Sequence, residues 1–439
     1  MTKARLDGLY MLLLGSVVFV LLGVALEHAA PSPLADFRGL YYTARCLVQH
    51  GDPYMQSAVQ RVYMGDGGPI ASDTATVRQI VTQTVYLPTA FSFTVPLALM
   101  PWGPAHLVWI ALTLASLIFA TFLIWSLGAN YAPVISGVLL GFFLAGSETL
   151  IITGNAAGLV ISLCAVAAWC FIRERFVLAG ILCLAMSLVL KPHDSGLVWL
   201  YFLLAGGVFR KRALQTLLVT IALSLPGVLW VWHASPNWMQ ELHSNLLAYS
   251  MHGGTNDPGL ASTGSHGLAM VVSLQAIISV FWDDARIYNL GSYAIVAPLL
   301  LVWAWITLRT RTLPARAWLA LASIAALTML PVYHRQYDAK LLLLTLPACV
   351  MLWVEGGVTG SLALLLTTAG FVLTSDLTWA ILLGLIDHIH LPATRLSGQI
   401  LTAVQVFPAP LILLILGVFY LWVYARHSSS SAQEADDRS

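Results

Sequence analysis

Two short stretches carry side chains whose types and spacing could do chemistry. Asp36 opens the stretch ADFRGLYYTA, soon after the first apolar segment of the chain. A carboxylate held there could act as a general base toward a hydroxyl group. Residues 333–340 read YHRQYDAK and join two apolar segments. Within them, Arg335 offers paired donors suited to a phosphate, and His334 can donate or shuttle a proton.

The element expected to position Asp36 is a helix in the first long polar segment. Ser32 followed by Pro33 predicts a helix start, with the serine as the cap and the proline in the first helical position. Asp36 would then lie in the first turn, where the helix dipole favours the carboxylate form.

Helical spacing divides this segment into an apolar arc with two polar edges. At about 100° per residue, Asp36, Thr43 and His50 lie along one edge, and Arg38 and Arg45 lie along the other. The arc between these edges holds Leu34, Phe37, Leu40, Tyr41, Ala44, Leu47 and Val48. This pattern predicts an amphipathic helix in the membrane interface, with a solvated charge on such a helix as the plainer alternative.

A second polar corner follows the sixth apolar segment. Lys191 precedes Pro192, and His193 and Asp194 follow at once. A lysine at a helix end commonly extends its amine to the interface. The neighbouring histidine and acid make a functional role an equal alternative.

Other polar residues are weaker candidates. Glu148 and Asn155 flank a Thr-Gly turn between two apolar runs, where a structural pairing is the favoured interpretation. The histidines of residues 233–266 have no zinc-binding spacing, although His266 could still reach a ligand. The chain has no glycine-rich nucleotide loop, no GxSxG and no DxD pair. A nucleotide-sugar site and a serine hydrolase are therefore not expected.

Composition identifies the class of protein that carries these residues. The chain has 439 residues, of which 59% are hydrophobic and 9% are charged, with a mean hydropathy of +0.81. Soluble domains carry about 25% charged residues. The chain is therefore predicted to be an all-α polytopic membrane protein that does not bind nucleic acid.

Charge placement predicts the topology. About fourteen apolar segments can be marked, but the basic clusters fit the positive-inside rule only if segments 88–100 and 264–282 do not cross. About 12 transmembrane helices remain, with both termini in the cytoplasm and a first outer loop at residues 27–87. Residues 1–427 form one membrane domain, and the Ser-rich acidic tail 428–439 is expected to be disordered.

These landmarks together resemble the GT-C class of integral-membrane glycosyltransferases. The match is to family 87, the polyprenol-phosphate-mannose-dependent alpha-mannosyltransferases. The ordered motifs are Asp36-Phe37, Tyr41-Tyr42-Thr43-Ala44, Gly51-Asp52-Pro53-Tyr54, Tyr86-Leu87-Pro88, Pro96-Leu97-Ala98, Gly154-Asn155, Lys191-Pro192 and His334. One departure is Asn155, where the family more often has glutamine.

The resemblance implies a GT-C fold and a hexosyltransferase. The enzyme would move a sugar, mannose in the family, from a polyprenyl phosphate to a lipid or glycan acceptor. The active site would lie on the extracytoplasmic side of the cell inner membrane, and no cofactor and no metal ion would be needed. In that family the acid of the first outer loop is the catalytic base of an inverting displacement, and the resemblance carries this role onto Asp36. Asp52 and Asp66 are the rival acids of the same loop, but Asp52 has a turn role and Asp66 lies among glycines. The candidate residues for binding the donor phosphate or other parts of the substrates are His334, Arg335, Lys191, Tyr41, Tyr42, Tyr86, Asn155 and His266.

Two other functions remain open from the sequence. A polytopic transporter or lipid flippase would place its charged groups at mid-membrane and would often show an internal repeat. A scaffold subunit would not need an acid beside a basic turn. Transfer of sugar, as opposed to movement of an intact lipid, would distinguish the enzyme from the flippase.

Overall fold

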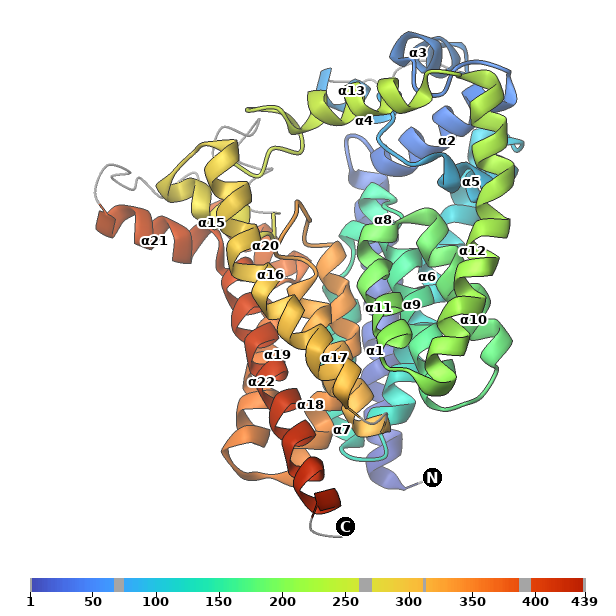
Figure 1. Cartoon of the computed structure of the whole chain (residues 1–439). Coiled ribbons are helices and arrows are strands. Elements are labelled where there is room, and N and C mark those ends of the chain that lie inside the picture. Colours follow the sequence, from blue (N-terminus) through green and yellow to red (C-terminus); the bar gives the residue numbers. More distant parts are fainter. Residues whose placement is uncertain (1, 67–74, 260–270, 311–312, 387–395, 437–439) are drawn as a thin grey trace.

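The computed structural model confirms the all-α fold class. It describes residues 2–66, 75–259, 271–310, 313–386 and 396–436, and no strand is present within these ranges. The helices α2, α3, α4 and α13 gather at one end of the molecule, and both chain termini lie at the opposite end (Figure 1). The described elements are α1 (Lys3–Ala29), α2 (Ala35–Val48), α3 (Gln56–Gly65), α4 (Ala75–Thr82), η1 (Pro88–Ala90), α5 (Phe91–Ala98), α6 (Trp102–Gly128), α7 (Pro133–Ala145), α8 (Thr149–Thr153), α9 (Ala157–Ile172), α10 (Val177–Leu190), α11 (Pro192–Leu204), α12 (Gly207–Ala234), α13 (Trp238–Ser250), α15 (Leu274–Phe281), α16 (Ala285–Arg309), α17 (Pro314–Leu327), η2 (Asp338–Thr345), α18 (Leu346–Glu355), α19 (Gly357–Leu373), α20 (Asp376–Ile386), α21 (Leu396–Val406) and α22 (Pro408–Asp436).

Several helices are long and apolar enough to cross a membrane. In the part of the chain that the structure describes there are 6 of them, or up to 7 if α19 and α20, which meet at a bend of 60°, form one span. Shorter apolar helices, such as α9, α10 and α17, lie among them. The protein is therefore a multi-pass membrane protein by length and composition, and the count of twelve spans stays a prediction.

The two segments expected not to cross contain only short helices. α5 has 8 residues and is interrupted by Pro96, and α15 also has 8 residues. A helix of that length rises only about 12 Å, which is well short of a bilayer core. Residues 264–270 of the second segment lie outside the described ranges.

The first apolar segment packs closely on α7. A Cβ atom added at Gly15 would lie 2.2 Å from the carbonyl oxygen of Gly141, and one added at Gly137 would lie 2.0 Å from that of Gly8. Small residues at both surfaces let two membrane helices approach backbone to backbone. This packing holds the last turns of α1 next to α8, and α8 in turn contacts α2.

The helix that carries Asp36 begins later than the sequence predicts. Ser32 does not cap it, and Pro33 is not its first residue; both predictions are wrong. α2 starts at Ala35 after Leu34, whose backbone is left-handed with φ 53°, and no side chain caps the helix. The amide of Leu34 instead donates to the carbonyl of Ile152 at 2.7 Å, which ties the start of α2 to α8.

The apolar arc of α2 faces protein. Phe37, Leu40, Tyr41, Ala44 and Leu47 are fully buried, and α2 packs against α5 and α4. The prediction of a helix lying on lipid is therefore not supported by the packing of this arc.

The turn between α8 and α9 packs closely against the first turn of α2. Gly154 in this turn has a left-handed backbone, and a Cβ atom there would lie 2.8 Å from that of Phe37. The Phe37 ring stacks on Trp109 with 4.4 Å between ring centroids, and Trp109 Nε1 donates to the carbonyl of Gly154 at 2.9 Å. The contact between α2 and this turn therefore requires glycine at position 154.

Replacing Gly154 by alanine is expected to lower the thermal unfolding temperature of the purified protein. A left-handed backbone costs a non-glycine residue about 1–2 kcal/mol, and the clash with Phe37 adds to that cost. Gly196→Ala is the matched control, since a Cβ atom there meets nothing within 4 Å. Equal unfolding temperatures for Gly154→Ala and the wild type would contradict the close packing of α2 on this turn.

Candidate active site

One face of α2 borders a cavity. Asp36, Gly39 and Thr43 contribute this face, and their spacing of three and four residues places them on one side of the helix. The other lining residues are Ile80, Gln83, Thr84, Val85, Tyr86, Lys191, His193, Tyr249, Thr255, Asn256, Tyr333, Arg335, Tyr337 and Asp338.

Asn155 fixes the carboxylate of Asp36. Its Nδ2 donates to Asp36 Oδ2 at 2.7 Å, and its Oδ1 accepts from the backbone amide of Ala157 at 2.9 Å. The amide of Ala157 can only donate, so the oxygen of Asn155 must face it and the amino group must face Asp36. The start of α9 thus sets the orientation of the acid on α2.

Burial is the strongest influence on the pKa of Asp36 and raises it above the ordinary value of 3.8. The hydrogen bond from Asn155 opposes this shift, and the charges of Arg335 and Lys191 oppose it further. Burial thus moves the pKa of Asp36 upward, in the direction that suits a general base.

Arg335 is a cation without an acid partner. Its Nη2 donates to the carbonyl of Thr255 at 3.1 Å, and its Nε donates to the hydroxyl of Tyr333. Among the residues that the structure describes, no carboxylate lies within ion-pair distance of its guanidinium. Because the guanidinium lines the cavity and forms no ion pair with a described carboxylate, it is suited to an anionic ligand.

Lys191 also lines the cavity, but acids neutralise it. Its Nζ lies 2.9 Å from Asp194 Oδ2 and forms a second ion pair with Asp338 Oδ1. Two carboxylates leave this lysine with little net charge to offer a phosphate. Of the two cations, Arg335 is therefore the stronger candidate.

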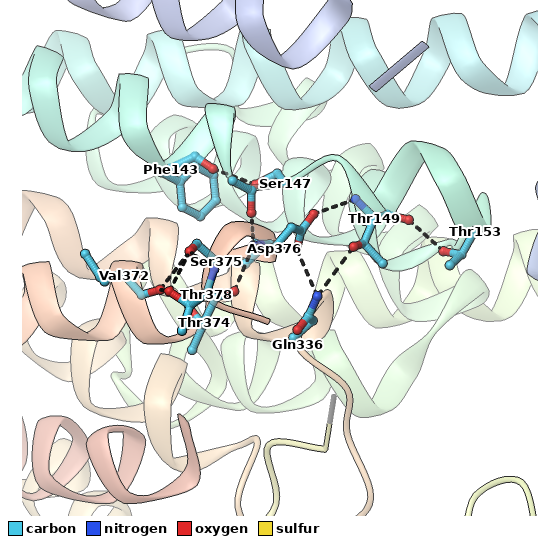
Figure 2. Close-up of polar contacts among 12 residues, drawn as sticks. Phe143, Ser147, Thr149, Thr153, Gln336, Val372, Thr374, Ser375, Asp376 and Thr378 are labelled. Carbon is cyan, nitrogen blue, oxygen red and sulfur yellow. Dashed lines mark hydrogen bonds and ion pairs between the residues drawn. The ribbon is translucent and has the colours of Figure 1, made fainter. Parts of the chain in front are cut away.

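A buried polar network holds the segment that carries Arg335. Gln336 donates to Asp376 Oδ1 at 3.1 Å, and the backbone amide of Thr149 donates to Asp376 Oδ2 at 2.5 Å (Figure 2). Lys340 donates to the carbonyls of Gly146 and Thr374. These bonds connect the start of η2 to the α7–α8 break and to the bend between α19 and α20. The segment that carries Arg335 is thereby held in place on two sides.

Only some of the other predicted site residues line the cavity. Tyr86 lines the cavity. His334 is 1% exposed and lies behind the cavity wall, against Asp194. Tyr41 and Tyr42 lie elsewhere: their rings pack around Trp102, and the Tyr41 hydroxyl donates to the carbonyl of Met100. His266 lies outside the described residues.

Several residues that line this cavity were not among the individual residues predicted to bind substrate. Tyr333, Tyr337 and Asp338 belong to the polar turn around His334, so the density of polar side chains there was the available signal. Tyr249 comes from α13, and no pattern in the sequence connects that helix with Asp36.

Comparison with known families identifies the chain. The model of glycosyltransferase family 87 matches residues 84–331, which is more than half of the sequence. Neither a curated protein nor a solved structure matches the chain. The family match favours sugar transfer over the transporter and flippase alternatives. By this match, and with an acid and a cation in one cavity of a largely helical membrane protein, this chain belongs to glycosyltransferase family 87.

Proposed function

We propose that the protein transfers mannose from a polyprenyl-phosphate donor to a hydroxyl group of a lipid or glycan acceptor. The reaction takes place on the extracytoplasmic side of the inner membrane. The observation that carries the proposal is that Asp36 and Arg335 line one cavity. A base and a phosphate-binding cation are the two groups that a single displacement at the sugar needs.

The proposed step is an inverting displacement. The acceptor oxygen attacks the anomeric carbon while Asp36 takes its proton. The bond between that carbon and the phosphate oxygen breaks, and the phosphate leaves with the electron pair. Arg335 stabilises the charge that develops on the leaving phosphate. One carboxylate suffices, in contrast to the pair used by most glycoside hydrolases.

The supporting residues position the two partners. Asn155 orients the carboxylate, and Tyr86 borders the space beside it. Lys191 and His334 act indirectly in this proposal, through their contacts with Asp194 and Asp338. Tyr41 and Tyr42 belong to α2 themselves. Their rings pack against Trp102, away from the cavity, and do not touch substrate.

Asp36→Asn is expected to lower transfer of radiolabelled mannose by about 10²–10⁴-fold, the usual effect of removing a general base. The variant keeps the shape of the side chain and should still insert in membranes. Asp52→Asn is the matched control, because Asp52 Oδ1 accepts from the amide of Tyr54, a bond that asparagine can keep. Near-normal transfer by Asp36→Asn together with loss in Asp52→Asn would show that the base is wrongly assigned.

The pH dependence of kcat/KM should reflect the raised pKa of Asp36. A base works only when deprotonated, so activity should fall with acid at a pH above the ordinary carboxyl value of 3.8. Arg335 and Lys191 also face this carboxyl, and both stay protonated over the range. Tyr86, Tyr249, Tyr333 and Tyr337 stay neutral, since burial raises their pKa values above 10.

The Asn155→Ser variant tests how the hydrogen bond from Asn155 affects the pKa of Asp36. Serine can still accept from the amide of Ala157, but it is too short to donate to Asp36. Loss of that hydrogen bond disfavours the carboxylate, so the acid limb should move to higher pH. An acid limb that stays in place would mean that Asn155 does not tune the base.

Arg335→Lys is expected to lower kcat/KM for the lipid donor by about 10- to 150-fold. The change keeps the charge but removes the planar pair of donors, and hydrogen bonds to charged groups contribute about 1.5–3 kcal/mol. The measurement is transfer as a function of donor concentration. An unchanged kcat/KM for donor would place the phosphate elsewhere in the cavity.

A further inference from the structure

The segment that follows α13 borders the cavity next to Arg335. Thr255 and Asn256 line the cavity, and the carbonyl of Thr255 accepts the hydrogen bond from Arg335 Nη2 at 3.1 Å. Asn256 is the next residue, and consecutive α-carbons lie about 3.8 Å apart. Asn256 has no role in the proposed reaction, yet it lies close to the cation assigned to the donor phosphate.

The side-chain amide of Asn256 is available to a ligand. Its backbone amide donates to the carbonyl of Tyr249 at 2.9 Å, but its side chain makes no hydrogen bond within the described residues. The residue is half-buried in the cavity wall. Because an asparagine side chain carries both a donor and an acceptor, it offers the cavity a group that can bond in both directions.

Several other neutral side chains of the same wall already have partners in the protein. The hydroxyls of Thr43 and Thr84 bond to each other at 2.8 Å. The Tyr249 hydroxyl donates to the carbonyl of Gln79 at 3.0 Å. Gln83 Oε1 accepts from Gln79 Nε2 at 2.9 Å. These groups shape the wall, whereas the amide at position 256 is left for a bound molecule.

Asp257 holds the segment on one side. It is fully buried, and its Oδ2 accepts from the backbone amide of Gly253 at 2.7 Å. Its Oδ1 accepts from the amide of Gly259 and from the hydroxyl of Tyr288, each at 2.8 Å. Hydrogen bonds to an ionised carboxylate are stronger than those between neutral groups. Since Tyr288 belongs to α16, these bonds fix the segment to that helix.

α4 holds the segment on the other side. Thr255 Oγ1 donates to Gln79 Oε1 at 3.2 Å. The amino group of Gln79 is used by Gln83, so the oxygen is the end that faces Thr255. Asn256 thus lies between two fixed neighbours, Thr255 and Asp257. A binding side chain that its surroundings hold in place loses little freedom when a ligand arrives.

We propose that Asn256 binds a hydroxyl group of the sugar carried by the donor and thereby helps to select that sugar. The assignment rests on the proposed function, because it takes the donor phosphate to lie at Arg335. The sugar is bonded directly to that phosphate through its anomeric carbon, so its ring lies within reach of the next side chain along. A sugar hydroxyl donates and accepts hydrogen bonds, as the amide of Asn256 does.

This contact would orient the sugar as well as select it. With its phosphate at Arg335 and a hydroxyl at Asn256, the donor is held at two points, which restricts rotation of the ring beside Asp36. A site that bonds a substrate hydroxyl also disfavours an analogue without it, because the polar group of the protein is then left unpaired.

Donor analogues test the proposal in the full-length protein. The probes are polyprenyl-phosphate mannose and its four monodeoxy analogues, each of which lacks one hydroxyl. The measured quantity is the ratio of kcat/KM for mannose to kcat/KM for each analogue. For at least one analogue, Asn256→Ala should lower this ratio by about 3- to 10-fold, the usual effect of one neutral hydrogen bond. The ratios for the remaining analogues should stay unchanged.

The ratios separate recognition from folding. A loss of folded protein lowers kcat/KM for all five donors by the same factor and leaves every ratio as it was. Asn237→Ala is the matched control, since Asn237 precedes α13 without a side-chain capping bond and does not line this cavity. It should leave all ratios at their wild-type values. Ratios that are equal in Asn256→Ala and the wild type, or a uniform loss for all five donors, would contradict the proposal.

Asp36→Asn distinguishes this inference from the proposed function. If Asp36→Asn transfers mannose at the normal rate while Asn256→Ala changes the ratios, the base is wrongly assigned and the sugar contact stands. If Asp36→Asn loses transfer while Asn256→Ala keeps every ratio, the base stands and the sugar contact is wrong.

Discussion

The hydrogen bond from Asn155 to Asp36 is the interaction on which the geometry of the site depends. It joins the first turn of α2 to the first turn of α9, two helices separated by more than a hundred residues. Gly154 makes the approach possible, because a side chain there would meet Phe37. The amide of Ala157 then fixes which end of Asn155 faces the acid. A carboxylate in a half-buried position is thereby held in one orientation and partly protected from protonation.

Some charged side chains around the cavity form ion pairs that hold the protein together, whereas Arg335 is left to bind a ligand. Lys191 pairs with both Asp194 and Asp338 and so joins the corner between α10 and α11 to η2. Within the described residues, the guanidinium of Arg335 instead donates to neutral groups, the carbonyl of Thr255 and the hydroxyl of Tyr333. Burying an unpaired cation is unfavourable unless something else compensates it. An anionic substrate that arrives with its own charge supplies that compensation. The polar network of Gln336 and Asp376 keeps the segment that carries Arg335 in place while the cavity is empty.

Local patterns predicted the elements, but contacts between distant segments determined the site. Helical spacing correctly placed Asp36 and Thr43 along one edge of a helix, since that depends only on sequence separation. The cap at Ser32 and Pro33 was wrong, because the carbonyl of Ile152 holds Leu34 in a left-handed backbone. The pairing of Lys191 with Asp338 could not be foreseen, because Asp338 lies far from it in the sequence. Nor could the sequence show that Tyr41 and Tyr42 pack on Trp102 and not on a ligand.

The most direct test of the central claim is a structure of the Asp36→Asn variant with polyprenyl-phosphate mannose bound. Without the base, the donor should remain intact in the cavity. The account predicts a phosphate oxygen within hydrogen-bond distance of the Arg335 guanidinium, with the anomeric carbon between that phosphate and the side chain at position 36. A donor phosphate bound away from Arg335, or a sugar whose anomeric carbon faces away from position 36, would contradict it.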